Sequence, residues 1–232
     1  MKDKVTPILG ILTLLSFAAG LFYAFTAPPD IHQKELVRIF YLHMPVALMS
    51  YVAYFVAMGY SLAYLITKNR KFDRLAYSSA EVGVLFTALT LIGGSLWAKP
   101  TWGTYWTWDP RLTTTAIGFL IYVGYFIIRG LIEDPDRRAR VGAVIGIVGT
   151  LYVPINYMSV YWWRSIHQTP TLKLLGDLEF SADPRMGVAL MCMFVAFVIG
   201  FVYFVRFRAV VADRIEAKED RLMEQSFQEG RI

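Results

Sequence analysis

The chain has 232 residues, of which 56% are hydrophobic and 16% aromatic, and its formal net charge is +5. This composition, with a mean hydropathy of +0.45, is too apolar for a soluble domain and indicates an integral membrane protein. The single cysteine, Cys192, excludes an internal disulfide and a Cys-x-x-Cys redox or heme-attachment motif. The excess of basic residues follows from membrane topology, as argued below, and we infer no nucleic-acid partner from it.

Six apolar runs are long enough, or nearly so, to cross a bilayer as helices. A helix rises about 1.5 Å per residue, so about 20 residues cross the hydrocarbon layer of about 30 Å. The runs are expected at 5–27, 40–66, 75–96, 114–129, 141–163 and 186–207, and the fourth is the shortest. They lack the alternation of barrel strands, and hydrocarbon leaves no backbone polar group unpaired. The sequence therefore predicts an all-α integral membrane protein, with a six-span domain over residues 1–207 and a cytoplasmic C-terminal tail over 208–232.

The distribution of Lys and Arg predicts the orientation, because basic residues are retained on the cytoplasmic side. With the N-terminus inside, the inside segments carry sixteen Lys and Arg residues and the outside segments carry seven. Both termini are therefore expected in the cytoplasm. The outside segments then include a loop from Trp97 to Thr113 and a second loop at 164–185.

The first outside segment and the second run bring a histidine and an arginine to the outer surface. Two prolines after the first run end its helix, and the segment that follows contains His32, which we expect to be an exposed loop histidine. The second run places His43 within its first turn or two. Arg38 lies about 7.5 Å further out along the same axis, at 1.5 Å per residue.

The later runs contain a few polar residues and one packing pattern. Glu81 lies in the third run and is expected to face the bundle, because a carboxylate facing lipid is costly. The fifth run contains Gly142-x-x-x-Gly146, a spacing that permits close helix approach, either within the bundle or against a partner helix. Asn156 lies deeper in the same run.

The segment from Trp97 to Thr113 is the most unusual part of the chain. It holds four of the six tryptophans, Trp97, Trp102, Trp106 and Trp108, followed by Asp109 and Arg111. An interfacial aromatic belt explains single indoles, but four within twelve residues exceed what a belt needs. Trp102 and Trp106 would share a face of a helical turn, whereas Trp106 and Trp108 would share one in an extended chain. Asp109 is expected to cap the fourth helix or to pair with Arg111.

Two histidines, His43 and His167, stand at helix ends on the side of the tryptophans. Imidazole binds iron, copper and zinc, but two histidines are too few for a closed zinc site with four protein ligands. Two imidazoles suit the axial positions of a heme, because the porphyrin supplies the other four ligands. Its flat macrocycle calls for aromatic surfaces and its propionates call for arginine, for which Arg38 and Arg111 are placed.

The residues from Trp102 to Thr113, WGTYWTWDPRLT, resemble the tryptophan-rich WWD signature of heme-handling proteins in cytochrome c maturation. The length, the six spans and the two histidines resemble the CcmC family in particular, and the resemblance covers essentially the whole chain. Pro110 departs from the pattern, because many relatives carry a small residue there.

The resemblance implies that the protein binds heme b as transient cargo at the periplasmic face of a bacterial inner membrane. It implies that heme is then presented to the heme chaperone CcmE for covalent attachment. The implied iron ligands are His43 and His167, and the WWD loop at 97–113 is the implied platform. The implied heme-binding residues are Trp97, Trp102, Trp106, Trp108, Asp109, Arg111 and Arg38. The small membrane protein CcmD and the ATPase complex CcmAB are the further partners that it implies.

No residue is an obvious acid, base or nucleophile for bond formation, so we expect a heme-presenting protein, with any lyase activity residing in the complex with its partners. One alternative is a membrane subunit of a heme transporter. It requires a polar path, for which Glu81 and Asn156 are the candidates at membrane depth. A redox enzyme similar to a cytochrome b is a second alternative, but it would normally place its histidines within the membrane.

Overall fold

A computed structural model describes residues 3–167 and 183–228 of the chain. Its helices are α1 (Val5–Thr26), α2 (Val37–Thr67), α3 (Arg70–Trp102), α4 (Pro110–Leu131), α5 (Pro135–Thr150), α6 (Tyr152–Trp162) and α7 (Pro184–Gln228). With α5 and α6 taken together, six stretches are long and apolar enough to cross a membrane. This confirms the predicted six-span all-α fold. Most of the expected second outside loop, residues 168–182, lies outside the described residues.

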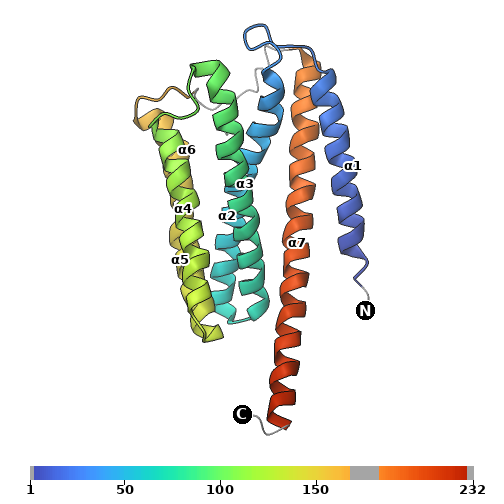
Figure 1. The fold of residues 1–232 in the computed structure, drawn as a ribbon, viewed down its shortest axis with the longest axis vertical. Helices are drawn as coiled ribbons and strands as arrows, with labels where there is room; N and C mark the ends of the chain where they lie inside the picture. Colours follow the sequence, from blue (N-terminus) through green and yellow to red (C-terminus); the bar gives the residue numbers. More distant parts are fainter. Residues whose placement is uncertain (1–2, 168–182, 229–232) are drawn as a thin grey trace.

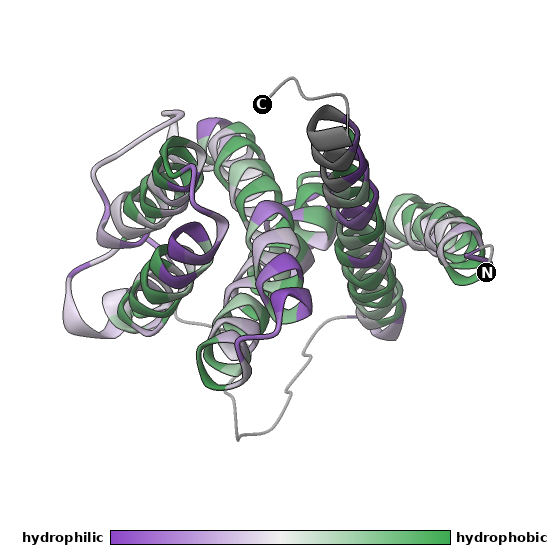
Figure 2. Cartoon of the chain, turned by 90° about the horizontal axis from the view of Figure 1, so that it is seen from below, coloured by the Kyte–Doolittle hydropathy of each residue, from purple (hydrophilic) through white to green (hydrophobic). Residues whose placement is uncertain are grey.

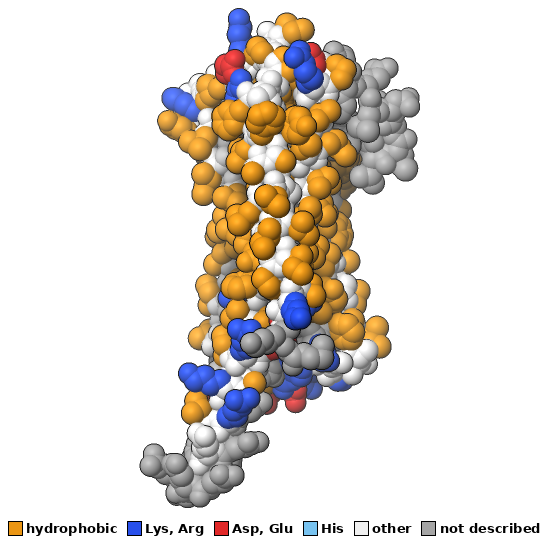
Figure 3. Space-filling view, turned by 90° about the vertical axis from the view of Figure 1, so that its right-hand side faces the viewer, with side chains coloured by type: hydrophobic (Ala, Val, Ile, Leu, Met, Phe, Trp, Pro, Cys, Tyr) orange, Lys and Arg blue, Asp and Glu red, His pale blue; other side chains and the backbone are white. Residues whose placement is uncertain are grey.

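The helices stand side by side in an elongated bundle (Figure 1). In the view along the helices, α2 and α3 lie centrally, α4, α5 and α6 lie on one side, and α7 and then α1 lie on the other (Figure 2). α1 packs almost wholly on α7. The face formed by these two helices carries a broad belt of hydrophobic side chains, with Lys and Arg gathered toward its ends (Figure 3). Such a belt is what a membrane-embedded surface requires.

The two ends of the bundle differ. We call the end where α3 and α6 finish and α4 begins the tryptophan end, since it carries Trp97, Trp102, Trp106, Trp108, Trp162 and Trp163. α1 begins and α7 ends at the opposite end (Figure 1). The described part of the expected C-terminal tail continues α7 as a helix to Gln228.

The tryptophan segment is shorter as a loop than the sequence predicts. α3 continues to Trp102 and α4 begins at Pro110, so the non-helical part is residues 103–109 and the expectation of a loop beginning at Trp97 is wrong. Hydropathy marks the edge of the hydrocarbon, whereas backbone hydrogen bonds continue a helix beyond it. α3 ends at Gly103, whose φ of +80° suits the left-handed position after a helix. α4 then starts with Asp109 as its N-cap and a proline in its first turn.

The fifth span is broken where one continuous helix was expected over 141–163. α5 ends at Thr150 and α6 begins at Tyr152, with Leu151 between them. Pro154 has no amide hydrogen to donate to the carbonyl of Thr150 four residues earlier, and its ring crowds that carbonyl. The proline therefore explains the interruption.

A buried ion pair closes the opposite end. Both terminal nitrogens of Arg129 on α4 donate to the carboxylate of Asp73 on α3, at 2.7 and 2.9 Å. The guanidinium also lies over the rings of Tyr77 and Tyr125, 5.1 and 5.5 Å from their centroids. Gly142 leaves room for it, because a Cβ there would lie 2.2 Å from an Arg129 nitrogen. Gly142 and the glycine four residues later are both buried, so this pattern packs within the bundle.

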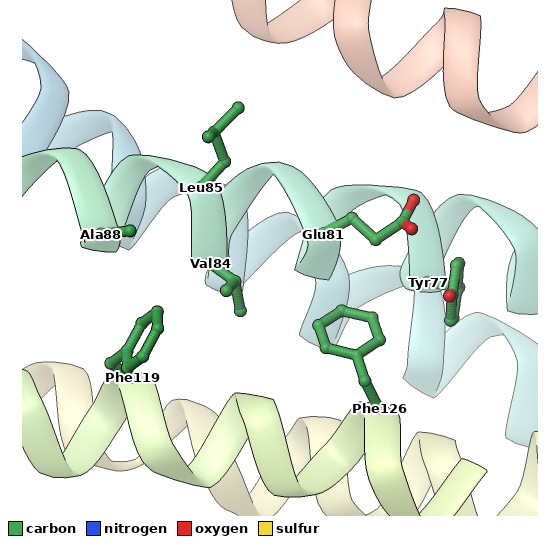
Figure 4. Close-up of a pocket in the computed structure, with 7 residues that line it drawn as sticks. All are labelled: Tyr77, Glu81, Val84, Leu85, Ala88, Phe119 and Phe126. Atoms are coloured by element: carbon green, nitrogen blue, oxygen red, sulfur yellow. The ribbon is translucent and has the colours of Figure 1, made fainter. Parts of the chain in front are cut away.

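Glu81 is also paired. Both of its carboxylate oxygens accept hydrogen bonds from Arg208 on α7, at 2.6 and 2.7 Å. The residue borders a groove of about 450 Å³ between α3 and α4 whose other lining includes Phe119 and Phe126. In Figure 4 the Glu81 carboxylate is directed away from these two rings. The charge is thus neutralised by α7 and the groove itself is largely apolar.

Candidate functional site

Asp109 is the polar centre of the tryptophan end, and its side chain is buried. Its Oδ1 accepts the backbone N–H of Arg111 at 2.9 Å, which caps α4, and lies 3.2 Å from Nδ1 of His167. Its Oδ2 accepts the Ser165 hydroxyl at 2.7 Å and the Ile166 N–H at 2.8 Å. Of the two roles expected for Asp109, capping is therefore the one found. The carboxylate also binds the chain segment that follows α6, a role that the sequence did not reveal.

The protonation states of Asp109 and His167 follow from these contacts. Burial opposes ionisation of Asp109, but the hydrogen bonds from Ser165, Ile166 and Arg111 outweigh it, and the pKa of Asp109 lies below its usual value. Burial lowers the pKa of His167 more than the nearby carboxylate raises it. At pH 7 the carboxylate is therefore ionised and the imidazole neutral. An ionised carboxylate only accepts hydrogen bonds, so Nδ1 carries the imidazole proton and Nε2 keeps a lone pair suited to a metal.

One indole contacts this pair, and two more lie on the loop that leads to Asp109. The ring of Trp102, in the last turn of α3, lies 5.0 Å from that of His167 in an edge-on arrangement. Trp106 and Trp108 lie 5.8 Å apart, as expected for an extended chain. Trp102 and Trp106 do not share a helical face, because the chain leaves the helix at Gly103. Trp108 is the most exposed of these indoles, at 82%. The platform is therefore built from a helix end and an extended loop together.

His43 stands on the inner side of the same end, in the second turn of α2. Its ring lies 5.7 Å from that of Trp97 and packs on Gly94 of α3, where an added Cβ would lie 3.0 Å from the imidazole. The His43 Nδ1 is buried and has no hydrogen-bond partner in the protein. A buried polar atom without a partner costs free energy unless something else satisfies it. Within the protein, Nδ1 of His43 therefore remains without the hydrogen bond or ligand that such a buried atom needs.

Trp97 connects His43 to the segment between α1 and α2, which contains Gln33. Its indole N–H donates to the side-chain oxygen of Gln33 at 3.1 Å, and its ring lies 5.9 Å from that of Phe40. His32, one residue before Gln33, is exposed, as expected. Gln33 was not anticipated as a neighbour of the tryptophans, because 64 residues separate it from Trp97.

The two arginines have different surroundings. The charge of Arg111 acts on both His43 and His167. Arg38 instead bonds Glu35 through its Nε at 2.7 Å and donates to the carbonyl of Ala24 at 2.9 Å and to that of Phe25. These carbonyls belong to the last turn of α1, and that turn contains no basic residue of its own. Arg38 thus satisfies orphan carbonyls of a helix C-terminus, a need that follows from the prolines beyond α1.

The site therefore contains two groups of residues in contact. His167 contacts Asp109 and Trp102, and His43 contacts Trp97. The charge of Arg111 acts on both histidines. Trp106 and Trp108 lie on the loop between them, and Arg38 is held at the edge by α1. Sequence reasoning identified these residue types but missed Ser165 and Gln33. A polar residue close to a helix end is the signal that these two offer.

Comparison with known proteins adds a family. The sequence model of the CcmC family, described as "Heme exporter protein C", matches residues 1–223. A protein named heme exporter protein C from Bradyrhizobium diazoefficiens is 38% identical over 202 residues, covering 87% of this chain and 76% of its own length. The proteins of that name from Haemophilus influenzae and Escherichia coli K12 are 31% and 32% identical, covering 94% and 78% of this chain and 87% and 72% of their own lengths. The chain is therefore a multi-pass membrane protein that belongs to the CcmC family.

Proposed function

We propose that this protein binds heme b as transient cargo at its tryptophan end and presents it to the heme chaperone CcmE for covalent attachment in c-type cytochrome biogenesis. The observation that carries the proposal is the Asp109–His167 pair. A buried, ionised carboxylate that holds a neutral imidazole by Nδ1 is the usual support of a metal-ligating histidine. The name of the relatives, heme exporter protein C, supports heme as the group concerned.

The residues present fit such a cargo. His167 would offer Nε2 to the iron, and His43 would supply the second imidazole, since its own Nδ1 has no protein partner. The porphyrin brings the remaining iron ligands with it. The indoles of Trp97, Trp102, Trp106 and Trp108 provide the aromatic surface that a flat macrocycle needs.

Arginine would hold the propionates. Arg111 is the stronger candidate, because its charge acts on both histidines, whereas Arg38 already bonds Glu35 and two carbonyls of α1. Binding a propionate through Arg38 would require it to give up part of that bonding. Arg38 is therefore a proposed site residue that also has a structural role at the end of α1.

The proposal places the tryptophan end on the periplasmic side, which the distribution of Lys and Arg supports. It places the protein in a bacterial inner membrane, which its similarity to bacterial relatives supports. CcmE would approach the exposed loop at Trp108, and CcmD and CcmAB are the further proposed partners. No acid, base or nucleophile of this chain is assigned to the bond-forming step. Any lyase activity is therefore attributed to the assembled complex.

The alternative is a membrane subunit of a heme transporter, which the word exporter in the relatives' names favours. The side chains at membrane depth favour presentation. Glu81 is neutralised by Arg208, and the fully buried Asn156 has its amide hydrogen-bonded at both ends. A Glu81→Gln variant separates the two: transport predicts that heme binding persists while loading of CcmE is lost, and presentation predicts that both persist.

The primary test is the absorption spectrum of the purified protein in detergent, oxidised and reduced, after expression with ample heme. We expect a bis-imidazole, low-spin b-type spectrum in the parent. It should become weak or high-spin in His43→Ala and in His167→Ala. His32→Ala is the matched control, since this exposed histidine of the same end should leave the spectrum unchanged. A parent without heme, or a spectrum indifferent to both ligand variants, would refute the assignment.

A further inference from the structure

Asn156 on α6 is fully buried and uses both ends of its amide. Its Nδ2 donates to the carbonyl of Arg111 at 2.9 Å, to the hydroxyl of Thr114 at 2.6 Å and to that of Thr115 at 2.9 Å. All three acceptors lie in the first turns of α4. Its Oδ1 accepts the hydroxyl of Tyr51 on α2. The NH₂ group has two hydrogens, which these three acceptors share, and the single carbonyl oxygen accepts from Tyr51, so both groups are engaged.

Tyr51 provides the link to the helix of His43. It lies eight residues after His43, about 12 Å further along the helix axis at 1.5 Å per residue. Its hydroxyl donates to Oδ1 of Asn156, so the two side chains join α2 to α6. Asn156 thus holds the main-chain carbonyl of Arg111 and, through Tyr51, ties the start of α4 to α2.

This link adds a polar connection where α2, α4 and α6 also meet through aromatic rings, since Tyr54 of α2 lies 3.9 Å from Tyr122 of α4 and 5.6 Å from Tyr152 of α6. α2 packs chiefly on α3, α5 and α7, whereas α6 packs on α4. Each of the three helices that meet at Asn156 leads to a residue of the site. α2 carries His43, α4 begins directly after Asp109, and α6 ends five residues before His167.

We propose that Asn156 and Tyr51 are positioning residues of the heme site. They hold Arg111 and the Asp109–His167 pair in place relative to the helix that carries His43. The proposal rests on the proposed function. Its physical reason is that buried polar groups are stable only with their partners, so this three-helix junction has one favoured geometry. Loosening it would change the relation between the two imidazoles without removing either.

The test uses the full-length protein in detergent. Asn156→Leu replaces the amide by an apolar group of similar size, and Tyr51→Phe removes one hydroxyl. We expect each variant to bind heme about tenfold to hundredfold more weakly, the usual cost of losing support behind a metal ligand. We also expect a high-spin component in its spectrum, because one imidazole no longer reaches the iron at its proper distance. Heme titration and the absorption spectrum measure these two effects.

Thr150→Val is the matched control. Thr150 is buried at the end of α5, bonds the hydroxyl of Tyr122 at 2.8 Å, and donates to the carbonyl of Gly146 at 2.8 Å. This network contains none of the proposed site residues. The control should lower the melting temperature and keep the parent spectrum and heme affinity.

The outcomes are distinguishable. A parent that binds no heme refutes the proposed function itself. A parent with a low-spin spectrum, together with parent-like Asn156→Leu and Tyr51→Phe variants, overturns the positioning role alone. The role is also overturned if Thr150→Val loses heme to the same extent, since general stability would then explain the result. If Asn156→Leu does not fold, Tyr51→Phe decides, because it deletes only a hydroxyl.

Discussion

Replacing Asp109 by asparagine tests the centre of the site with little change in shape. Asparagine caps a helix about as well as aspartate, so the start of α4 should persist. The carboxylate, however, accepts four hydrogen bonds, two at each oxygen. An amide has one oxygen and one NH₂ group, so in either orientation the NH₂ group faces donors.

Both orientations of the new amide weaken the site. If its oxygen replaces Oδ2, the NH₂ group faces two groups: the Arg111 N–H, which loses its acceptor, and His167. His167 must then accept at Nδ1 and carry its proton on Nε2, where iron would bind. If its oxygen replaces Oδ1, the NH₂ group faces the N–H of Ile166, which loses its acceptor. A buried donor left unpaired costs about 1–3 kcal/mol. We therefore expect a loss of stability of about this size and heme binding weakened about tenfold to hundredfold.

Heme titration, the absorption spectrum and thermal unfolding in detergent measure these effects. Asp134→Asn is the matched control. Asp134 also caps a helix, accepting the N–H of Arg137 at 2.6 Å at the start of α5, but it touches no histidine. The control should keep the parent spectrum. An Asp109→Asn variant with the parent's low-spin spectrum and affinity would show that the carboxylate does not set the tautomer of His167.

Three further predictions concern the ion pair, the helix packing and the effect of pH. Arg129→Met leaves the carboxylate of Asp73 buried without its cation, so we expect about 3–5 kcal/mol of destabilisation and a lower melting temperature. An unchanged melting temperature would refute the stabilising role of the pair. Gly118→Ala places a Cβ 2.3 Å from a buried tyrosine ring, whereas a Cβ at Gly124 of the same helix meets nothing within 4 Å. The first should destabilise by about 1–3 kcal/mol and Gly124→Ala should not, as thermal unfolding will show. Because the pKa of His167 lies below its usual value, the neutral ring persists at lower pH than in the unfolded chain. Heme affinity should therefore stay constant down to about pH 6.5 and fall only below it. If heme affinity measured against pH fell with a midpoint above about 6.5, the assignment of His167 as an iron ligand would be contradicted.

The fold could be predicted from the sequence because hydrocarbon leaves few solutions. Apolar runs of sufficient length must be helices, and six of them are found. The ends of the helices were harder to predict, because hydropathy changes at the membrane surface while the backbone continues to hydrogen-bond. Trp97 and Trp102 therefore lie on α3 rather than in a loop. Pro154 was visible in the sequence, but its effect depends on how the helix packs.

The candidate site could be predicted as a set of residue types but not as a set of contacts. Tryptophans, histidines and arginines at helix ends are readable from composition and position. The contact between Asp109 and His167 joins residues 58 apart, and no local pattern encodes it. Arg38 was expected beside a propionate, whereas its partners are Glu35 and the carbonyls at the end of α1. Such a role becomes visible only when the last turn of a helix is examined for unpaired carbonyls.

The location of the polar groups explains why a site for a releasable cargo would lie at the end of this bundle. Within the spans, Asn156 and Tyr51 bond each other, and Asn156 and Thr150 bond neighbouring helices, so these residues tie the scaffold together. Beyond them, the proposed ligands stand near helix ends, His43 in the second turn of α2 and His167 just after α6. The segment with His167 is held to Asp109 by hydrogen bonds that can break without unpacking a helix. A site built this way can bind tightly through two imidazoles and still release its cargo by local movement of one segment.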